Sequence, residues 1–361
     1  MTEVTPYARQ YLDHPTVVIK TIEMETIPVI DISKLKGGAS AEELKPTLKL
    51  IRESLSELGF FYVSGHGISE ELQSELISLS QKFFAEDLDF KMKIDMKSGG
   101  LAWRGYFPPG GELTSGRPDR KEGIYFGREL SAEHPAVKVK TALHGPNQWP
   151  SKSEYSRFKE LTLKYMSELT ELGHLLMEGI ALSLGLNRKY FRERFTEDPT
   201  ILFRIFNYQK HVWSEGDDEW GVREHTDYGF LTLLRQDESG GLQVKSRTSS
   251  WIEAPPIKNT FVVNIGDMLE VWTHGIYKAT PHRVKNQGKT DRISLPFFFD
   301  PGWTSKLQPI DRNLLPAELL SRVATEKSER WDSLSLMNLP KNLTYGEFLW
   351  EKVKKVFPQL A

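Results

Sequence analysis

The stretch 224-EHTDYGFLTLLRQDESGGLQV-244 places two metal-binding residue types, His225 and Asp227, one residue apart directly before an apolar run. The run from Phe230 to Leu234 has the composition of a buried β-strand. In a strand, residues i and i+2 point to the same face. If His225 and Asp227 lie at a strand end, both side chains face inward and can bind adjacent positions of one metal ion.

A third ligand is expected from a later strand-like run. His282 lies in ATPHRV, well after the first two residues. Two histidines and one carboxylate form the facial triad of non-haem Fe(II) oxygenases, which leaves coordination positions open. The 361 residues contain no Cys, so any metal must be held by His, Asp or Glu. The alternative for the three residues is a structural hydrogen-bonding set.

Two other histidines are weaker candidates. His274 lies in WTHGIY beside Gly275, and an expected hairpin turn there favours exposure over metal binding. His66 lies in the Gly-rich turn of SGHGI and is expected to have a structural role. Both are therefore left out of the predicted metal site.

Arg292 and Ser294 in DRISLPFFFD form a second pair spaced by two residues, and hence on one face of a strand. A guanidinium beside a hydroxyl can bind a carboxylate through a two-pronged ion pair and a hydrogen bond. The alternative is an interior salt bridge. A metal triad followed by a carboxylate-binding pair indicates a cosubstrate that reaches from the metal to Arg292.

The charge of the chain is nearly balanced, with a formal net charge of −2. This balance gives no electrostatic reason to expect nucleic acid or an anionic membrane surface as a partner. The N-terminal stretch MTEVTPYARQYLDHPTVVIK has no apolar segment of the signal-peptide type, and no run approaches the roughly 20 apolar residues of a membrane span. We therefore expect a soluble, cytoplasmic protein.

The pattern of apolar residues along the sequence changes at about residue 200. Beyond it, short β-rich runs alternate with turns, a spacing typical of a sandwich or barrel of the jelly-roll type. The expected organisation is a mixed α/β N-terminal region that contributes pocket loops (1–150), a bracing helix with the β core (151–305), and a helical C-terminal tail (306–361). The predicted fold class is mainly β with flanking helices.

Capping motifs predict where two of the helices begin. Ser40 and Glu43 have the capping-box spacing before a run of leucines at helical intervals. Ser151 and Glu154 have the same spacing before the long amphipathic helix that we expect to brace the sheet.

Residues 98–123 are rich in Gly and Pro, which predicts a long loop broken by short strands. The segment also contains Trp103, Tyr106 and Phe107, large rings that a solvated loop does not need. We predict that the segment is a lid over the pocket and that at least one ring faces the metal cavity or closes its rim. The alternative is a surface connection.

The ordered set His225-Thr226-Asp227, His282 and Arg292-Ile293-Ser294 resembles the isopenicillin N synthase-like branch of the Fe(II)/2-oxoglutarate-dependent dioxygenase superfamily. Supporting stretches are GFFYVSGHGI, GGLQV, NIGDML and YKATPHRV. The resemblance implies a double-stranded β-helix, a distorted jelly roll, with N-terminal helices and pocket loops. It also implies that the triad holds Fe(II) and that the Arg-x-Ser pair binds the far carboxylate of 2-oxoglutarate.

A further residue is carried over from the same resemblance. Family members often have an Asn-x-Tyr or Asn-Tyr element before the triad, and its Tyr contacts 2-oxoglutarate. Asn207 and Tyr208 in FNYQKH match this element. The plant version continues with Pro-Pro, whereas this chain has Gln209 and Lys210, which argues against a close match to flavonoid or gibberellin oxidases.

The implied reaction is the oxidation of a small organic substrate. 2-Oxoglutarate and O2 are consumed, succinate and CO2 are released, and a C–H bond is hydroxylated, desaturated or closed into a ring. Two alternatives remain open: an iron oxidase of the same fold that does not use 2-oxoglutarate, and a non-catalytic ligand-binding sensor. The resemblance does not name the substrate, because pocket residues in this family come from variable loops.

Overall fold

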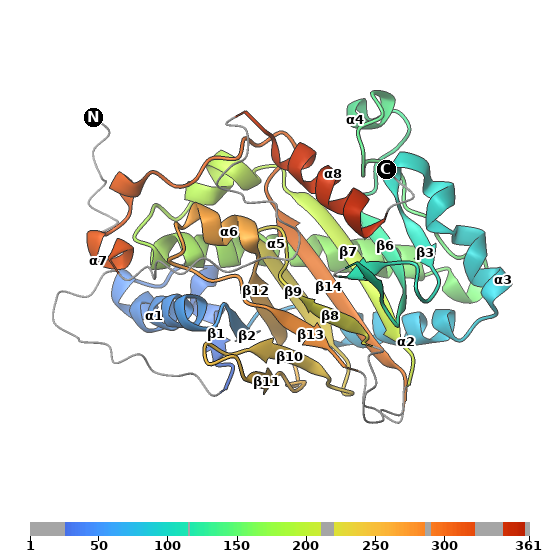
Figure 1. Cartoon of the computed structure of the whole chain (residues 1–361), viewed down its shortest axis with the longest axis horizontal. Coiled ribbons are helices and arrows are strands. Elements are labelled where there is room, and N and C mark those ends of the chain that lie inside the picture. The colour runs from blue at the N-terminus through green and yellow to red at the C-terminus, as the bar shows by residue number, and fades with distance from the viewer. Residues whose placement is uncertain (1–25, 115, 211–219, 286–289, 322–341, 358–361) are drawn as a thin grey trace.

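Two facing β-sheets form the centre of the protein (Figure 1). The computed structural model describes residues 26–114, 116–210, 220–285, 290–321 and 342–357. The large sheet has eight strands in the order β1-β2-β12-β9-β14-β7-β6-β3. Their bounds are β1 Val29–Asp31, β2 Phe60–Ser64, β3 Gly105–Phe107, β6 Glu122–Gly127, β7 Thr200–Tyr208, β9 Leu231–Gln236, β12 Phe261–Ile265 and β14 Arg292–Asp300.

The smaller sheet has four strands in the order β11-β10-β13-β8. Their bounds are β8 Val222–His225, β10 Leu242–Lys245, β11 Trp251–Glu253 and β13 His282–Val284. A separate hairpin consists of β4 (Leu113–Thr114) and β5 (Arg117–Pro118). Apart from the parallel pair β1–β2, the described strand pairs are antiparallel. This is the predicted jelly-roll architecture.

Strands from the N-terminal part of the chain complete the large sheet. On one side β2 pairs with β12, and on the other side β6 pairs with β7 and carries β3 at the edge. The region before residue 150 is therefore part of the same sheet as the β core. Its backbone hydrogen bonds are satisfied by strands that come much later in the sequence.

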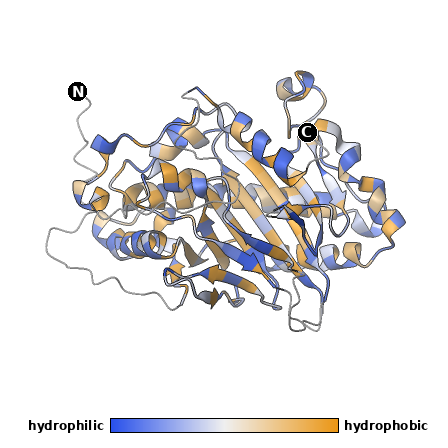
Figure 2. Cartoon of the chain, viewed as in Figure 1, coloured by the Kyte–Doolittle hydropathy of each residue, from blue (hydrophilic) through white to orange (hydrophobic). Residues whose placement is uncertain are grey.

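Three long helices cover the outer face of the large sheet, and the longest, α5, packs on β9 and β14 (Figure 1). The hydropathy colouring shows both hydrophilic and hydrophobic residues on the helices, whereas the strands at the centre of the large sheet are largely hydrophobic (Figure 2). None of the described helices is long and apolar enough to cross a membrane.

The long helices are α1 Ala41–Glu57, α2 Glu70–Phe84 and α5 Phe158–Ser183. The shorter helical elements are η2 Ser33–Lys36, α3 Leu88–Lys91, η3 Met92–Ile94, η4 Met96–Ala102, α4 Pro135–Lys138, η5 Ser153–Tyr155, η6 Arg192–Thr196, α6 Asp267–Trp272, η7 Arg312–Leu314, α7 Ala317–Leu320 and α8 Tyr345–Val356.

The first helix begins where its capping box predicts. The Ser40 side chain accepts a hydrogen bond from the Glu43 N–H, and the Glu43 carboxylate accepts one from the Ser40 N–H at 2.8 Å. The chain leaves α1 through Gly59, whose φ of 71° lies in the left-handed region. A Cβ atom there would lie 2.1 Å from the carbonyl oxygen of Lys278, so glycine is required.

The capping box predicted at Ser151 and Glu154 is wrong. α5 begins later, at Phe158, with no side-chain cap, and the short turn η5 precedes it. Tyr155 in that turn is buried and stacks on Phe90 with ring centres 5.9 Å apart. Tertiary packing of this ring therefore outweighs the local capping signal.

The prediction that an aromatic ring of residues 98–123 faces the metal cavity is wrong. Trp103, Tyr106 and Phe107 are all buried, and none of them lines that cavity. Tyr106 and Phe107 belong to β3, so strand pairing turns this part of the segment into a packed sheet edge. Phe107 packs behind the cavity residue Phe206, with ring centres 6.2 Å apart, whereas Tyr106 packs on Phe83 of the second long helix at 6.0 Å. That the segment moves as a lid stays a prediction.

The described part of the predicted C-terminal tail contains α7 and α8, whereas residues 322–341 and 358–361 lie outside the described residues. Thr344 and Glu347 form a capping box at the start of α8. One face of α8 carries Leu349 and Val353, and both side chains line the cavity between the sheets. The tail therefore supplies a wall of the site, and does not merely cover the surface.

Candidate metal centre

Two antiparallel strands of the smaller sheet bring the metal-binding residue types together. His225 is the last residue of β8, His282 is the first residue of β13, and the two face each other in the strand register. Asp227 follows β8 in the loop that leads to β9. All three residues predicted from the sequence therefore lie at the same end of the smaller sheet.

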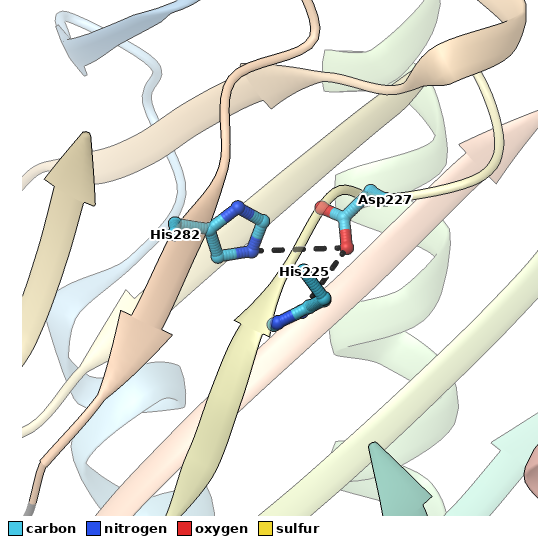
Figure 3. Close-up of side chains that lie close together, drawn as sticks. All are labelled: His225, Asp227 and His282. Carbon is cyan, nitrogen blue, oxygen red and sulfur yellow. Dashed lines mark ion pairs between the residues drawn. The ribbon is translucent and has the colours of Figure 1, made fainter. Parts of the chain in front are cut away.

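The three side chains point toward one another (Figure 3). The Nε2 atoms of His225 and His282 each lie 3.8 Å from Oδ1 of Asp227. The three candidate ligand atoms lie within 4.8 Å of one another. Within the described parts of the chain, no other group of three His, Cys, Asp or Glu residues has metal-binding spacing. Two imidazoles and one carboxylate on one side of an ion suit non-haem Fe(II).

Backbone carbonyls orient both imidazoles. Nδ1 of His225 lies 2.8 Å from the carbonyl oxygen of Arg223, and Nδ1 of His282 lies 3.2 Å from that of Thr280. Because a carbonyl oxygen can only accept, each Nδ1 carries the proton and donates it. Each Nε2 then has its lone pair available for a metal, the arrangement commonly found around metal-binding histidines.

The two oxygens of Asp227 have different roles. Oδ2 accepts hydrogen bonds from the Thr232 hydroxyl and, at 2.7 Å, from the Asn264 amide. Oδ1 is the oxygen that faces the two histidines. The carboxylate is thereby held in an orientation that offers one oxygen to a metal ion.

Burial and charge set the protonation states that metal binding needs. Burial and the neighbouring His225 lower the pKa of His282 to about 4, and burial also lowers the pKa of His225. Burial acts to raise the pKa of Asp227, but the two histidines and its hydrogen bonds hold it below its usual value. At neutral pH the site therefore offers two neutral imidazoles and one carboxylate.

The predicted carboxylate-binding pair lies on the inner face of the large sheet. Arg292 and Ser294 are on β14, and Tyr208 is the residue opposite Arg292 on β7. All three line the same cavity as the triad. The Ser294 hydroxyl lies 3.5 Å from the Tyr208 hydroxyl, so the two form one polar end of the cavity.

The guanidinium of Arg292 is fully buried yet has unused hydrogen-bonding capacity. Nε donates to the carbonyl of Gly240 at 2.6 Å and Nη2 donates to Gln236 at 3.0 Å, while Nη1 is buried without a partner. A buried donor without an acceptor is costly. A carboxylate in the cavity would provide that acceptor, so the residues present fit the far end of 2-oxoglutarate.

Sequence reasoning missed several residues of this cavity. Thr232 and Asn264 orient Asp227, Gln236 orients Arg292, and α8 provides an apolar wall. A signal for Thr232 and Asn264 was present, because each is a single polar residue inside an apolar strand run, FLTLL or FVVNI. A polar side chain in a buried strand needs a partner. Four cavity residues, Glu112, Leu113, Thr114 and Lys121, belong to the segment 98–123 predicted to lie over the pocket. Further cavity residues that the sequence did not indicate are Arg204, Leu349, Val353, Val356 and Phe357.

The other two histidines lie outside the site. His66 is buried, accepts a hydrogen bond from the Ile68 N–H at 3.1 Å and lies 3.2 Å from the Asn259 carbonyl, which confirms a structural role. His274 is half-buried, and the prediction of exposure is wrong because its Nε2 lies 2.6 Å from the Ile310 carbonyl. It does not join the triad.

Comparison with known protein families gives two matches along the chain. The 2OG-Fe(II) oxygenase superfamily matches residues 199–301, which include the triad and the Arg-x-Ser pair. The N-terminal domain described as "non-haem dioxygenase in morphine synthesis" matches residues 27–152.

Individual relatives match almost the whole chain. A probable iron/ascorbate oxidoreductase of Dictyostelium discoideum is 46% identical over 95% of this chain and 98% of its own length. A 1-aminocyclopropane-1-carboxylate oxidase of Dictyostelium mucoroides is 36% identical over 93% of this chain and 96% of its own. A full-length Neurospora crassa protein solved with alpha-KG and thymine is 29% identical, with a TM-score of 0.73 over 91% of this chain and 96% of that one.

Proposed function

Because this chain belongs to the 2OG-Fe(II) oxygenase superfamily, we propose that it hydroxylates a small organic metabolite with release of succinate and CO2. Its cofactors are Fe(II) and the cosubstrate 2-oxoglutarate, with O2 as the oxidant. One observation carries the proposal: the triad shares a cavity with a buried arginine that has an unpartnered N–H group.

In this proposal His225, Asp227 and His282 hold Fe(II). The Nδ1–H groups of the histidines stay bonded to backbone carbonyls, so that both Nε2 lone pairs face the ion. Asp227 supplies Oδ1, while Thr232 and Asn264 keep Oδ2 away from the metal. Three protein ligands would leave coordination positions of the ion open for 2-oxoglutarate and O2.

Arg292 and Ser294 bind the far carboxylate of 2-oxoglutarate. The planar guanidinium forms the ion pair, and the hydroxyl adds a hydrogen bond. Tyr208 contacts the same end of the cosubstrate, because its hydroxyl lies beside that of Ser294. Gln236 and Gly240 hold the guanidinium in place before the cosubstrate binds, which reduces the entropy that binding costs.

Iron at this site supplies the activation of O2 and couples decarboxylation of 2-oxoglutarate to oxidation of a C–H bond. One oxygen atom enters the new alcohol, and the other enters the new carboxylate of succinate. The residues of the chain bind and orient both organic molecules and exclude water. The apolar walls formed by Phe206, Phe298 and Val353 serve that exclusion.

The relatives support a small organic substrate. The Neurospora protein was solved with thymine, and the Dictyostelium relative is named for 1-aminocyclopropane-1-carboxylate. These two molecules differ chemically, so they support the size class of the substrate without naming it.

An anaerobic titration tests the function. Adding 2-oxoglutarate to the Fe(II)-loaded protein should produce a metal-to-ligand charge-transfer band, and the His282→Ala variant should lack it. His134→Ala is the matched control, since His134 caps the short helix α4 away from the cavity. After metabolites are screened under O2, one should yield its alcohol together with an equal amount of succinate. Substrate oxidation without succinate would support the oxidase alternative, and absence of the band in the unmodified protein would overturn the proposal.

A further inference from the structure

The cavity has a second polar end that the proposed function does not use. β7 places Tyr208, Phe206, Arg204 and Leu202 at alternate positions, and all four line the cavity. Tyr208 lies at the Arg292 end. Arg204 lies four residues from it, about 13 Å along the strand. The two ends are therefore too far apart for one polar group of a ligand to contact both. The iron ligands line the same cavity.

The guanidinium of Arg204 lies over two aromatic rings. Its central carbon lies 4.3 Å from the centre of the Tyr125 ring and 4.7 Å from that of Phe298. Stacking of this kind fixes the plane of the guanidinium and leaves its N–H groups along the edges. The side chain is thereby oriented before any ligand binds.

The N–H groups of Arg204 are poorly satisfied. Nη1 lies 3.4 Å from Oε1 of Glu112, a long contact, and Nε is buried without a partner. Arg292 at the other end of the cavity also has one buried nitrogen without a partner, Nη1, although Arg292 is fully buried whereas 18% of the Arg204 side chain is exposed. A buried N–H group of a guanidinium needs a hydrogen-bond acceptor. Each end of the cavity thus has one arginine with unused donors.

The charged neighbours of Arg204 contact one another more closely than they contact Arg204. Nζ of Lys121 lies 2.9 Å from Oε2 of Glu112 and forms a second ion pair with Asp119. The Tyr125 hydroxyl donates to Oε1 of Glu112. Lys121 therefore contacts both carboxylates closely, whereas Arg204 contacts only Glu112, through the longer 3.4 Å pair.

Arg204 remains charged in this setting. Burial acts to lower its pKa, but the interactions with the neighbouring Tyr125 and with the carboxylates of Glu112 and Asp227 raise the pKa above its usual value. Arg204 and Asp227 also line the same cavity. An anion bound at Arg204 would therefore share that cavity with the metal site.

The cavity wall near Arg204 is apolar. Phe298, Leu349, Val353 and Phe357 line it, the last three from α8 and the residue that follows it. A ligand that spans this part of the cavity needs an anionic group at one end and an apolar body.

From this arrangement, and resting on the proposed function, we propose that the primary substrate is a carboxylate. Its carboxylate group forms a two-pronged ion pair with Arg204, and its body packs against α8. This contact directs a C–H bond of the substrate toward the iron. Arg204 is therefore a substrate-binding residue that sets specificity, distinct from the residues that bind 2-oxoglutarate.

The test compares carboxylic acids with their primary amides. Each pair is titrated anaerobically into the Fe(II)/2-oxoglutarate complex, and perturbation of the charge-transfer band reports binding near iron. The panel contains short aliphatic acids, amino acids and aryl-acetic acids. We expect at least one acid to bind about tenfold or more tighter than its amide, the effect of roughly 1.4 kcal/mol or more.

Two variants test the residue. Arg204→Gln should remove the preference for the acid, and Arg204→Lys, which keeps the charge but loses the planar donor, should weaken it. Both should still form the charge-transfer band with 2-oxoglutarate, which shows that the fold and the iron site are intact. Arg157→Gln is the matched control, because this arginine pairs with Glu75 on the surface.

The proposal is overturned if no acid in the panel binds more tightly than its amide, or if Arg204→Gln binds the best acid as tightly as the unmodified protein does. These results can be distinguished from a failure of the proposed function. If the proposed function fails, the unmodified protein does not form the charge-transfer band with 2-oxoglutarate at all.

Discussion

Arg292 and Tyr208 lie directly opposite each other in the register of β14 and β7, with the guanidinium carbon 4.8 Å from the centre of the Tyr208 ring. Gln236 and the Gly240 carbonyl bind two other nitrogens of the same guanidinium. The contacts around Arg292 leave Nη1 as its unpartnered donor. The position that we propose for the far carboxylate of 2-oxoglutarate is therefore set by the chain itself, before the cosubstrate arrives.

Replacing Arg292 should weaken cosubstrate binding specifically. Arg292→Lys keeps the positive charge but loses the planar two-pronged donor, so the dissociation constant of 2-oxoglutarate should rise about tenfold or more, equivalent to roughly 1.4 kcal/mol or more. Anaerobic titration of the charge-transfer band measures this constant. Mn(II) affinity, measured by calorimetry, should stay the same. If 2-oxoglutarate binds the variant normally, Arg292 serves another carboxylate.

Loss of either histidine ligand should abolish Fe(II)-dependent turnover. In His225→Ala or His282→Ala, the two remaining ligands compete poorly with water for the ion. Calorimetric titration with Mn(II), a redox-stable substitute, reports the affinity directly. His134→Ala should bind Mn(II) like the unmodified protein. Normal affinity in both ligand variants would remove the triad from the metal site.

The hydrogen bonds to Asp227 should contribute to metal affinity. Asn264→Ala and Thr232→Val each remove one donor to Oδ2, so the carboxylate is free to rotate and its Oδ1 is less well placed. We expect the Mn(II) dissociation constant to rise by about tenfold in each variant. The double variant should be weaker than either single one. Unchanged affinity in all three would show that the metal ligand is oriented by other contacts.

Asp300 should make stability depend on pH. It is buried at the back of the cavity, where it accepts hydrogen bonds from the Tyr345 hydroxyl at 2.7 Å and the Phe230 N–H at 2.8 Å. Burial raises its pKa from an ordinary value of 3.8 to about 7. The folded protein therefore binds this proton more tightly than the unfolded chain does, so this group's contribution to stability falls as the pH rises from about 4 to about 7 and is constant above.

Asp300→Asn removes that titration while keeping the shape of the side chain. The variant should gain stability relative to the unmodified protein as the pH rises through this window, by about 4 kcal/mol at most. Urea unfolding of both metal-free proteins at several pH values between about 4 and about 8 measures the difference. Tyr345→Phe, which keeps the carboxyl, should retain the pH dependence. A constant difference between Asp300→Asn and the unmodified protein would show that Asp300 does not titrate in this range.

The chemistry of the site was largely readable from the sequence. The spacing of Arg292 and Ser294 uses the two-residue period of a strand, which depends only on local backbone geometry. Asp227 lies in the loop just after β8, so the strand period predicted its closeness to His225 without predicting the loop that provides it. His282 could be added because its residue type completes a known ligand set. The absence of Cys then restricted the choice of ligands. These inferences needed no knowledge of which strands pair.

Long-range packing decided the rest. Only the register between β8 and β13 places His282 opposite His225, and only the order of strands brings Asn264 of β12 to Asp227. The same packing turned Phe107 away from the cavity and brought Arg204 into it. A residue's local pattern tells which face of its own element it occupies, but not which element covers that face. That choice depends on the burial of apolar surface summed over the whole fold, and the tertiary structure alone decides it.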